Sequence, residues 1–271
     1  MFGQVLSQAP VFLLVAIRCF SLLMTLPLFS MRNIPGAAKV ALAGFMAFNI
    51  FGQVEYSSYA SLLAPEQTFT AQFIMLMVGE ALIGVITGFY ITIIFAAFSA
   101  AGQFFAFQMG FSASEVYDAL SQVENPLMGQ YLNLIAMLIF MQTRLFQKLF
   151  LGGLISSFKS LNAFSIVNDM LSGAILPRFF MKGLSELFAN ALVISLPIMG
   201  TLMLITISTG ILSKAAPQMN LLSEGFPVML LTSFFILTAL MPSMIDAFNR
   251  CFDGGFARLE QLILALGGKR I

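Results

Sequence analysis

Six long apolar segments run through the chain, and they constrain its fold more than any other feature. They lie at residues 10–29, 37–54, 69–107, 126–141, 184–212 and 226–245. Most are close to the roughly 20 residues that cross a bilayer as a helix. Only 9% of the 271 residues are charged, against about 25% in soluble proteins. The sequence therefore predicts one all-α domain, residues 1–271, that lies in or against a lipid membrane.

The segment 69–107 is nearly twice as long as one membrane span. It fits either one long bent helix or a tight helical hairpin, because the only turn-compatible residues near its middle are Gly79, Gly84 and Gly88. The four-residue spacing of Gly84 and Gly88 also permits another helix to pack closely. If the segment is a hairpin, the Lys and Arg residues predict cytoplasmic loops around 32–39 and 144–182.

Three prolines, Pro27, Pro197 and Pro242, lie inside or near the end of apolar segments. A proline removes one backbone donor and bends the helix that contains it. In lipid, the carbonyl groups freed in this way must be covered by neighbouring protein. We therefore expect kinked helices, with much of their surface facing other subunits.

Two charged residues lie deep in the apolar segments. Arg18 is near the middle of the first segment, and Glu80 is about 11 residues into the third, which is some 16 Å along a helix. Each charge costs roughly 2.5 to 3.5 kcal/mol at the bilayer centre, so both should face protein. We predict a buried Arg18/Glu80 pair. Such a pair either seals or gates a path, or it is a structural ion pair or a contact to a partner subunit.

The C-terminal region is predicted to form an amphipathic helix, with Gly254-Gly255 as an expected break. Its apolar positions recur at helical spacing: Phe248, Phe252, Phe256, Leu259, Ile263 and Leu266. Two roles remain open for this face, docking against a partner and lying on the membrane surface.

Several classes of function are excluded by what the sequence lacks. There is no histidine, so a Ser/His/Asp triad is impossible. We find no Gly-x-x-x-x-Gly-Lys-Ser/Thr phosphate loop. The two cysteines, Cys19 and Cys251, do not suggest a metal cluster. The net charge is +1 and the basic residues are dispersed, which argues against a nucleic-acid partner. We expect no enzymatic activity, no metal and no cofactor.

Four patches of sequence resemble the FliR family, the flagellar export-gate proteins related to SctT of injectisome type III secretion systems. The first contains Arg18, Pro27, Arg32, Pro35 and Lys39, and the second contains Gly84, Gly88-Phe89, Ala96-Ala97, Gly102 and Gln108-Met109-Gly110. The third is Asp118 followed by Asn125-Pro126, and the fourth is APQMNLLSEGFPV at 216–228. Together these patches extend from the first apolar segment to the sixth.

The resemblance implies a fold of kinked helical hairpins, with a FliP-like first part at about 1–180 fused to a FliQ-like last part at about 181–271. It implies a non-enzymatic subunit of the flagellar type III protein export gate, in the bacterial inner (cytoplasmic) membrane at the flagellar basal body. The implied partners are FliP-like and FliQ-like subunits, a FlhB-like protein and the exported unfolded flagellar proteins. The subunit would close the FliP/FliQ assembly and plug its channel.

The resemblance also assigns roles to two polar segments. A channel plug loop would contain Gln108, Met109, Gly110, Phe111, Ser112, Tyr117, Asp118, Asn125 and Pro126. A turn at the cytoplasmic entrance would contain Pro217, Gln218, Met219 and Asn220. A polar loop is tolerated at membrane depth when it is buried in protein or lines a wet cavity. From the residues alone, an ordinary extracytoplasmic connection and a simple proline turn remain the alternatives.

The plug segment departs from the family pattern at two places. Ala113 and Val116 fall near positions that are aromatic in the family, and Ala119 follows Asp118 where the family commonly has proline. We expect Phe111 and Tyr117 to take over the sealing role.

The alternative function is a self-contained secondary transporter or channel. A transporter should contain paired discontinuous helices and a polar site at the midplane. Here the polar residues gather in one loop, and the buried charges are Arg18 and Glu80. This distribution favours a gate subunit.

Overall fold

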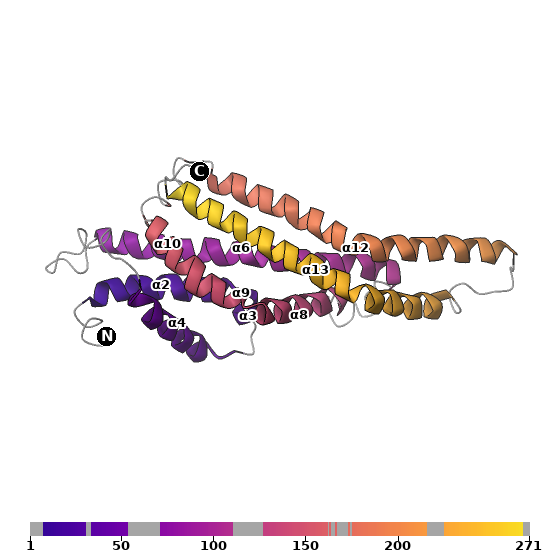
Figure 1. Cartoon of the computed structure of the whole chain (residues 1–271), viewed down its shortest axis with the longest axis horizontal. Coiled ribbons are helices and arrows are strands. Elements are labelled where there is room, and N and C mark those ends of the chain that lie inside the picture. The colour runs from indigo at the N-terminus through magenta and orange to yellow at the C-terminus, as the bar shows by residue number, and fades with distance from the viewer. Residues whose placement is uncertain are drawn as a thin grey trace. The chain divides into compact units, whose positions relative to one another are not determined.

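The computed structural model describes residues 8–30, 34–53, 71–110, 127–161, 163, 166, 173, 175–215 and 225–267. Within these residues every regular element is a helix (Figure 1), which confirms the all-α prediction. Three helices are long and apolar enough to cross a membrane, or four if one broken pair of helices counts as a single span. Each predicted apolar segment coincides largely with helix.

The first described helix, α2 (Ala9–Thr25), ends two residues before Pro27. Leu26 is extended, with ψ 135°, because the ring of Pro27 excludes the helical conformation of the residue before it. The short α3 (Pro27–Ser30) follows, and then α4 (Gly36–Phe51). Helix α4 packs against α2, and the Phe12 and Phe51 rings meet edge to face at 5.6 Å.

The third apolar segment forms one continuous helix, α6 (Ala71–Met109), of 39 residues and about 58 Å. The hairpin alternative is therefore wrong, and the predicted cytoplasmic loops lose the premise on which they rested. The three central glycines serve close packing, as their spacing also allowed. A Cβ at Gly84 or Gly88 would collide with Ser21 or Thr25 of α2, and one at Gly79 would collide with Ala163.

Residues 127–160, which follow α6 in the chain, are helical but irregular. Helix α8 (Leu127–Gln142) ends before Arg144, whose backbone is left-handed with φ 56°. Helix α9 (Leu145–Gln147), the π-helix η1 (Lys148–Leu154) and α10 (Ile155–Ser160) then follow without a break. The described residues from Leu145 to Ser160 are therefore helical throughout.

The last two helices are α12 (Ile175–Ala215) and α13 (Phe226–Leu266), each of 41 residues. Pro197 lies inside α12 and Pro242 lies inside α13. Each proline removes one backbone hydrogen bond from its helix, and Figure 1 shows both helices changing direction partway along their length.

The predicted C-terminal amphipathic helix is the last part of α13, and two expectations about it are wrong. The helix continues through Gly254-Gly255 without a break. Its apolar face packs inside this chain, because five of its six apolar residues, Phe248, Phe252, Leu259, Ile263 and Leu266, are at most 7% exposed. That face is therefore available neither to a partner nor to the membrane surface.

The chain divides into two compact units, and α6, α12 and α13 continue from one into the other. The first unit contains 1–93, 140–183 and 254–271, and the second contains 94–139 and 184–253. The core of the second unit includes four buried rings from α6 and α13. The Phe98 ring lies 4.3 Å from that of Phe248 and 5.2 Å from that of Phe252. The Phe95 ring lies 5.2 Å from that of Phe252.

Candidate functional site

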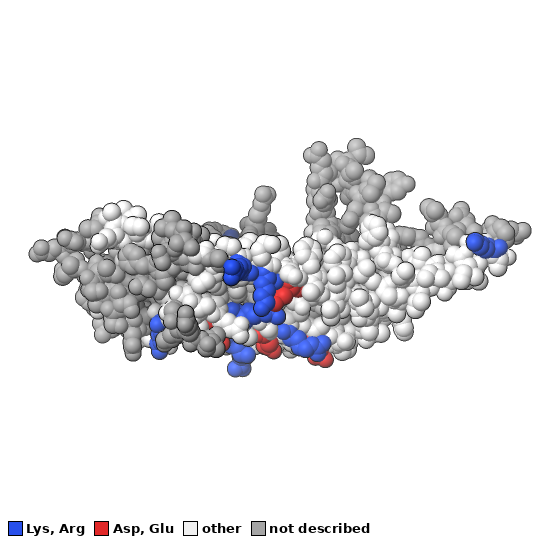
Figure 2. All heavy atoms as spheres, turned by 90° about the horizontal axis from the view of Figure 1, so that it is seen from above, with Lys and Arg blue, Asp and Glu red and all other residues white. Residues whose placement is uncertain are grey.

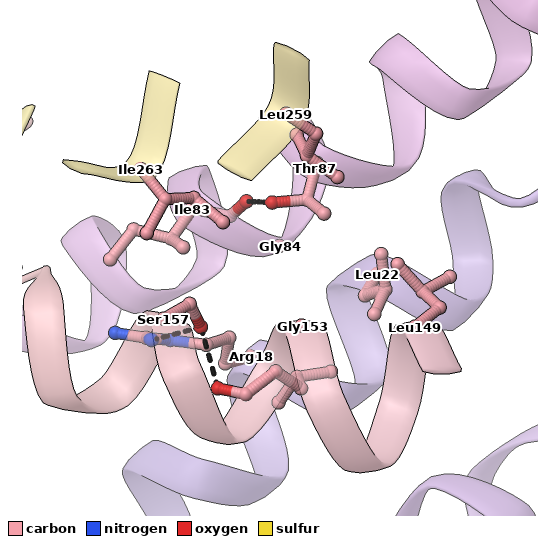
Figure 3. A pocket seen from close by; sticks show the side chains of 11 residues that line it. Arg18, Leu22, Ile83, Gly84, Thr87, Leu149, Gly153, Ser157, Leu259 and Ile263 are labelled. Atoms are coloured by element: carbon pink, nitrogen blue, oxygen red, sulfur yellow. Dashed lines mark hydrogen bonds between the residues drawn. The ribbon is translucent and has the colours of Figure 1, made fainter. Parts of the chain in front are cut away.

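Arg18 of α2 lies at the centre of a buried polar cluster in the first unit, with 1% of its surface exposed. Its Nε donates to Glu80 Oε2 at 2.5 Å, and its Nη2 donates to Glu80 Oε1 at 2.9 Å. Its Nη1 donates to Ser157 Oγ of α10 at 2.9 Å (Figure 3). The structure thus brings Arg18 and Glu80 together as a two-pronged ion pair.

The cluster satisfies both charges inside the protein. Glu80 is fully buried, and both of its oxygens accept from the planar guanidinium, the geometry in which Arg binds a carboxylate best. The guanidinium carbon also lies 3.7 Å from the centre of the Phe158 ring, close enough for a cation–π interaction. Ser157 Oγ completes the network by donating to the carbonyl of Leu154 at 2.7 Å. The net charge of the buried pair is therefore zero.

The glycines of α6 allow α2 to approach closely enough for Arg18 to contact Glu80. Gly84 follows Glu80 by one helical turn and lies against the backbone of Arg18 and Leu22 in α2. Across the same contact, Thr92 Oγ1 donates to the carbonyl of Thr25 at 2.8 Å. Because Gly84 has no side chain, the two helices approach closely enough for a direct contact between Arg18 and Glu80.

A small cavity beside Arg18 limits what the cluster can do. Its volume is about 10 Å³, and Leu22, Ile83 and Leu149 are among the residues that line it (Figure 3). A single water molecule needs roughly 10 to 15 Å³, so a substrate does not fit. The geometry here supports a structural ion pair that holds α2, α6 and α10 together, rather than a path across the protein.

Two members of the cluster, Ser157 and Phe158, were missed by reasoning from the sequence. They lie 139 and 140 residues after Arg18 in a short helix of mixed polarity. No spacing or motif links them to Arg18. Only the fold brings α10 against α2 and α6.

The predicted plug loop begins at the end of α6. Gln108 is half-buried and Met109 is fully buried. Gly110 has φ 84°, and its N–H donates to the carbonyl of Phe107 at 3.2 Å. A glycine in this left-handed conformation is a common way to end a helix. The other predicted site residues lie outside the described part of the chain: Phe111, Ser112, Tyr117, Asp118, Asn125, Pro126, Pro217, Gln218, Met219 and Asn220.

Within the described residues, no group of three or more His, Cys, Asp or Glu side chains is placed to hold a metal ion. The buried polar or charged side chains of that part of the chain are Arg18, Glu80, Ser157, Ser195 and Ser233. The Ser195 and Ser233 hydroxyls donate to carbonyl groups of their own helices. The described part therefore offers one buried charged site, and its groups bind one another.

Comparison with known proteins now identifies the family. The chain matches the sequence profile of the bacterial export proteins, family 1, over residues 9–255. It is similar to the flagellar biosynthetic protein FliR of Bacillus subtilis (strain 168), with 29% identity over 98% of this chain and 99% of that protein. FliR of Escherichia coli (strain K12) is 28% identical over 97% and 96% of the two chains. FliR of Borreliella burgdorferi is 30% identical over 67% and 66%. The chain therefore belongs to the FliR family of bacterial export proteins, membrane components of the flagellar export apparatus.

Proposed function

We propose that this protein is a non-enzymatic subunit of the flagellar type III protein export gate, in the bacterial inner membrane at the flagellar basal body. It assembles with FliP-like and FliQ-like subunits next to a FlhB-like protein, and it closes their assembly around a channel for unfolded flagellar proteins. Its first part, about 1–180, takes a FliP-like place in this assembly, and about 181–271 takes a FliQ-like place. Family membership supports this proposal, and one observation carries it: the exposed apolar surface of α12 and α13.

This surface covers most of the apolar stretches of both helices. In the most apolar stretch of α12 only 28% of the residues are buried, and in that of α13 only 17%, against 56% in α6. Residues 187–213 and 226–245 carry no charged side chain. On the face shown in Figure 2, most of the charged side chains gather in one region, and a long surface without charge separates them from a basic side chain at the right. Lipid, other subunits or both must cover this surface, because it is too apolar to face water.

The row of exposed apolar side chains on α12 is longer than the hydrocarbon core of a bilayer is thick. Leu184 is 44% exposed and Leu212 is 57% exposed, and they are separated by about 42 Å along the helix. The hydrocarbon core of a bilayer is only about 30 Å thick. In a straight helix of ordinary tilt, part of the row would extend beyond the hydrocarbon, and neighbouring protein would supply apolar cover there; the bend at Pro197 shortens this excess.

The hydroxyl groups of α12 are compatible with such apolar surroundings. Thr201, Thr206 and Thr209 donate to carbonyl groups three or four residues earlier in the same helix. Ser208 and Ser213 do the same. These donors therefore need no water or partner group, so the surface can be buried without leaving them unpaired.

The first test is native mass spectrometry of the tagged protein, extracted in mild detergent after co-expression with FliP-like and FliQ-like subunits. We expect one copy of this chain in a complex with several copies of each partner. A Leu196→Trp variant should weaken the complex, because a packed interface does not accept the larger ring, whereas lipid does. Glu260→Gln, outside the apolar row, should leave the complex unchanged. A stable monomer or homodimer that ignores both partners would instead favour the self-contained transporter, and solute flux in liposomes would then be measured.

The second test concerns the plug. Deletion of residues 110–124 should leave the complex assembled but let small solutes leak across the membrane, because the segment would no longer fill the channel. Replacing 111–124 with a Gly/Ser linker of equal length keeps the connection and removes Phe111 and Tyr117. This variant should leak as well if those rings make the seal. Unchanged membrane permeability in both variants, with the complex intact, rules out the plug.

A further inference from the structure

A second, larger cavity lies in the first unit. It is an open groove of about 310 Å³ between α4 and the stretch around η1. Its apolar lining includes Leu42, Phe45, Met46 and Ile50 on one wall and Phe146 and Phe150 on the other. Phe45 is 67% exposed, so part of this apolar lining is open at the protein surface.

The walls of this groove are already formed. The Phe146 ring packs against those of Phe150 at 4.6 Å and Phe29 at 5.8 Å. On the α4 wall, Asn49 Nδ2 donates to the carbonyl of Phe45 at 2.9 Å, and Gln53 Nε2 donates to that of Asn49 at 3.3 Å. These amide donors are used within their own helix. The groove therefore suits an apolar occupant that needs no array of hydrogen bonds from it.

Within the described residues, the charged side chains that lie within three positions of a lining residue are Lys39, Arg144 and Lys148. Lys39 lies one helical turn before Leu42, on the same face of α4. Arg144 precedes the lining residue Gln147 by three positions, and Lys148 follows it directly. Arg144 and Lys148 are exposed, and none of the described residues that line the groove is acidic. Such a border complements an anionic headgroup.

We propose that this groove binds an acyl chain of an anionic phospholipid, with the headgroup phosphate near Lys39, Arg144 and Lys148. The apolar lining suits an acyl chain, because the amide donors of Asn49 and Gln53 are already used within their own helix. The three cations select an anionic headgroup over a neutral one. This lipid site goes beyond the proposed export function and does not depend on it.

The test measures binding of phosphatidylglycerol and phosphatidylcholine of equal chain length to the purified full chain, together with any subunits that co-purify. We expect phosphatidylglycerol to be retained preferentially. A Lys39→Gln/Arg144→Gln/Lys148→Gln variant should bind it on the order of 100-fold more weakly, since each cation near a lipid surface contributes about fivefold. Binding of phosphatidylcholine should not change. The matched control, Lys159→Gln/Arg178→Gln/Lys182→Gln, removes three exposed cations elsewhere and should retain the preference.

A second variant tests the acyl chain separately from the charges. Met46→Trp fills the groove while keeping all three cations, and it should reduce phosphatidylglycerol binding without changing the elution of the folded protein in size-exclusion chromatography. Equal retention of both lipids by the wild type would overturn the proposal. So would an equal loss in the control triple variant, unchanged binding in Met46→Trp, or displacement of the lipid by free glycerol phosphate, which has no acyl chain.

Discussion

Replacing Arg18 with Met is expected to destabilise the fold by about 3 to 5 kcal/mol, because it leaves the Glu80 carboxylate buried without the guanidinium that binds both of its oxygens. The loss affects Glu80 strongly, because its side chain is entirely buried and both of its carboxylate oxygens accept hydrogen bonds from Arg18. The substitution also removes the donor to Ser157 Oγ and the cation over the Phe158 ring. Thermal unfolding of the detergent-purified variant and wild type measures the difference.

Three further variants separate the ion pair from the packing of the side chain. Arg18→Met/Glu80→Leu should recover much of the loss, because an apolar pair of similar volume carries no buried charge. Arg18→Lys should fall between wild type and Arg18→Met, since an ammonium group lacks the planar fork. Arg250→Met, at an exposed position of α13, should change stability by no more than about 0.5 kcal/mol. If the double variant is as unstable as Arg18→Met alone, the unpaired charge is not the cause.

Replacing Phe98 with Ala is expected to cost about 3 to 5 kcal/mol, the range for removing a buried ring from a packed core. Phe98 is 0% exposed, and its ring lies 4.3 Å from that of Phe248 and 5.2 Å from that of Phe252. The cavity would lie where α6 packs on α13 in the second unit, so this contact should loosen first. Limited proteolysis and thermal unfolding of the purified protein would record both effects.

The chain offers a matched control for this prediction. Phe107 lies on the same helix, but its side chain is 75% exposed, so Phe107→Ala should alter the stability of the isolated chain by no more than about 0.5 kcal/mol. Phe98→Leu, which keeps much of the apolar volume, should cost less than Phe98→Ala. Equal losses in Phe98→Ala and Phe107→Ala would show that the four-ring core does not stabilise the second unit.

The candidate site was only partly predictable from the sequence. Arg18 and Glu80 stood out because a charge in an apolar segment needs a partner, and the structure pairs them. Ser157 and Phe158 gave no signal, because a serine and a phenylalanine in a short helix satisfy many environments. The loop residues from Phe111 onward were identified by family resemblance, and they lie outside the described residues.

For the long third segment, residues 69–107, the sequence is compatible with both a hairpin and one helix. Glycine is compatible with both a turn and a helix interior, where it costs about 1 kcal/mol relative to alanine. Local preference therefore did not decide between a hairpin and one helix. The deciding contacts come from Ser21 and Thr25 of α2 and from Ala163, each more than 55 residues from the glycine that it meets.

The sequence alone indicates that the chain lies in or against lipid, that it is helical, and that its buried charges need partners. These follow from the transfer of each segment out of water and from backbone hydrogen bonding, which act locally. The tertiary structure alone decided that α6 is unbroken, that α10 completes the Arg18 cluster, and that the amphipathic face of α13 is buried within this chain. These outcomes depend on shape and packing between segments far apart in the sequence, where local patterns carry no information.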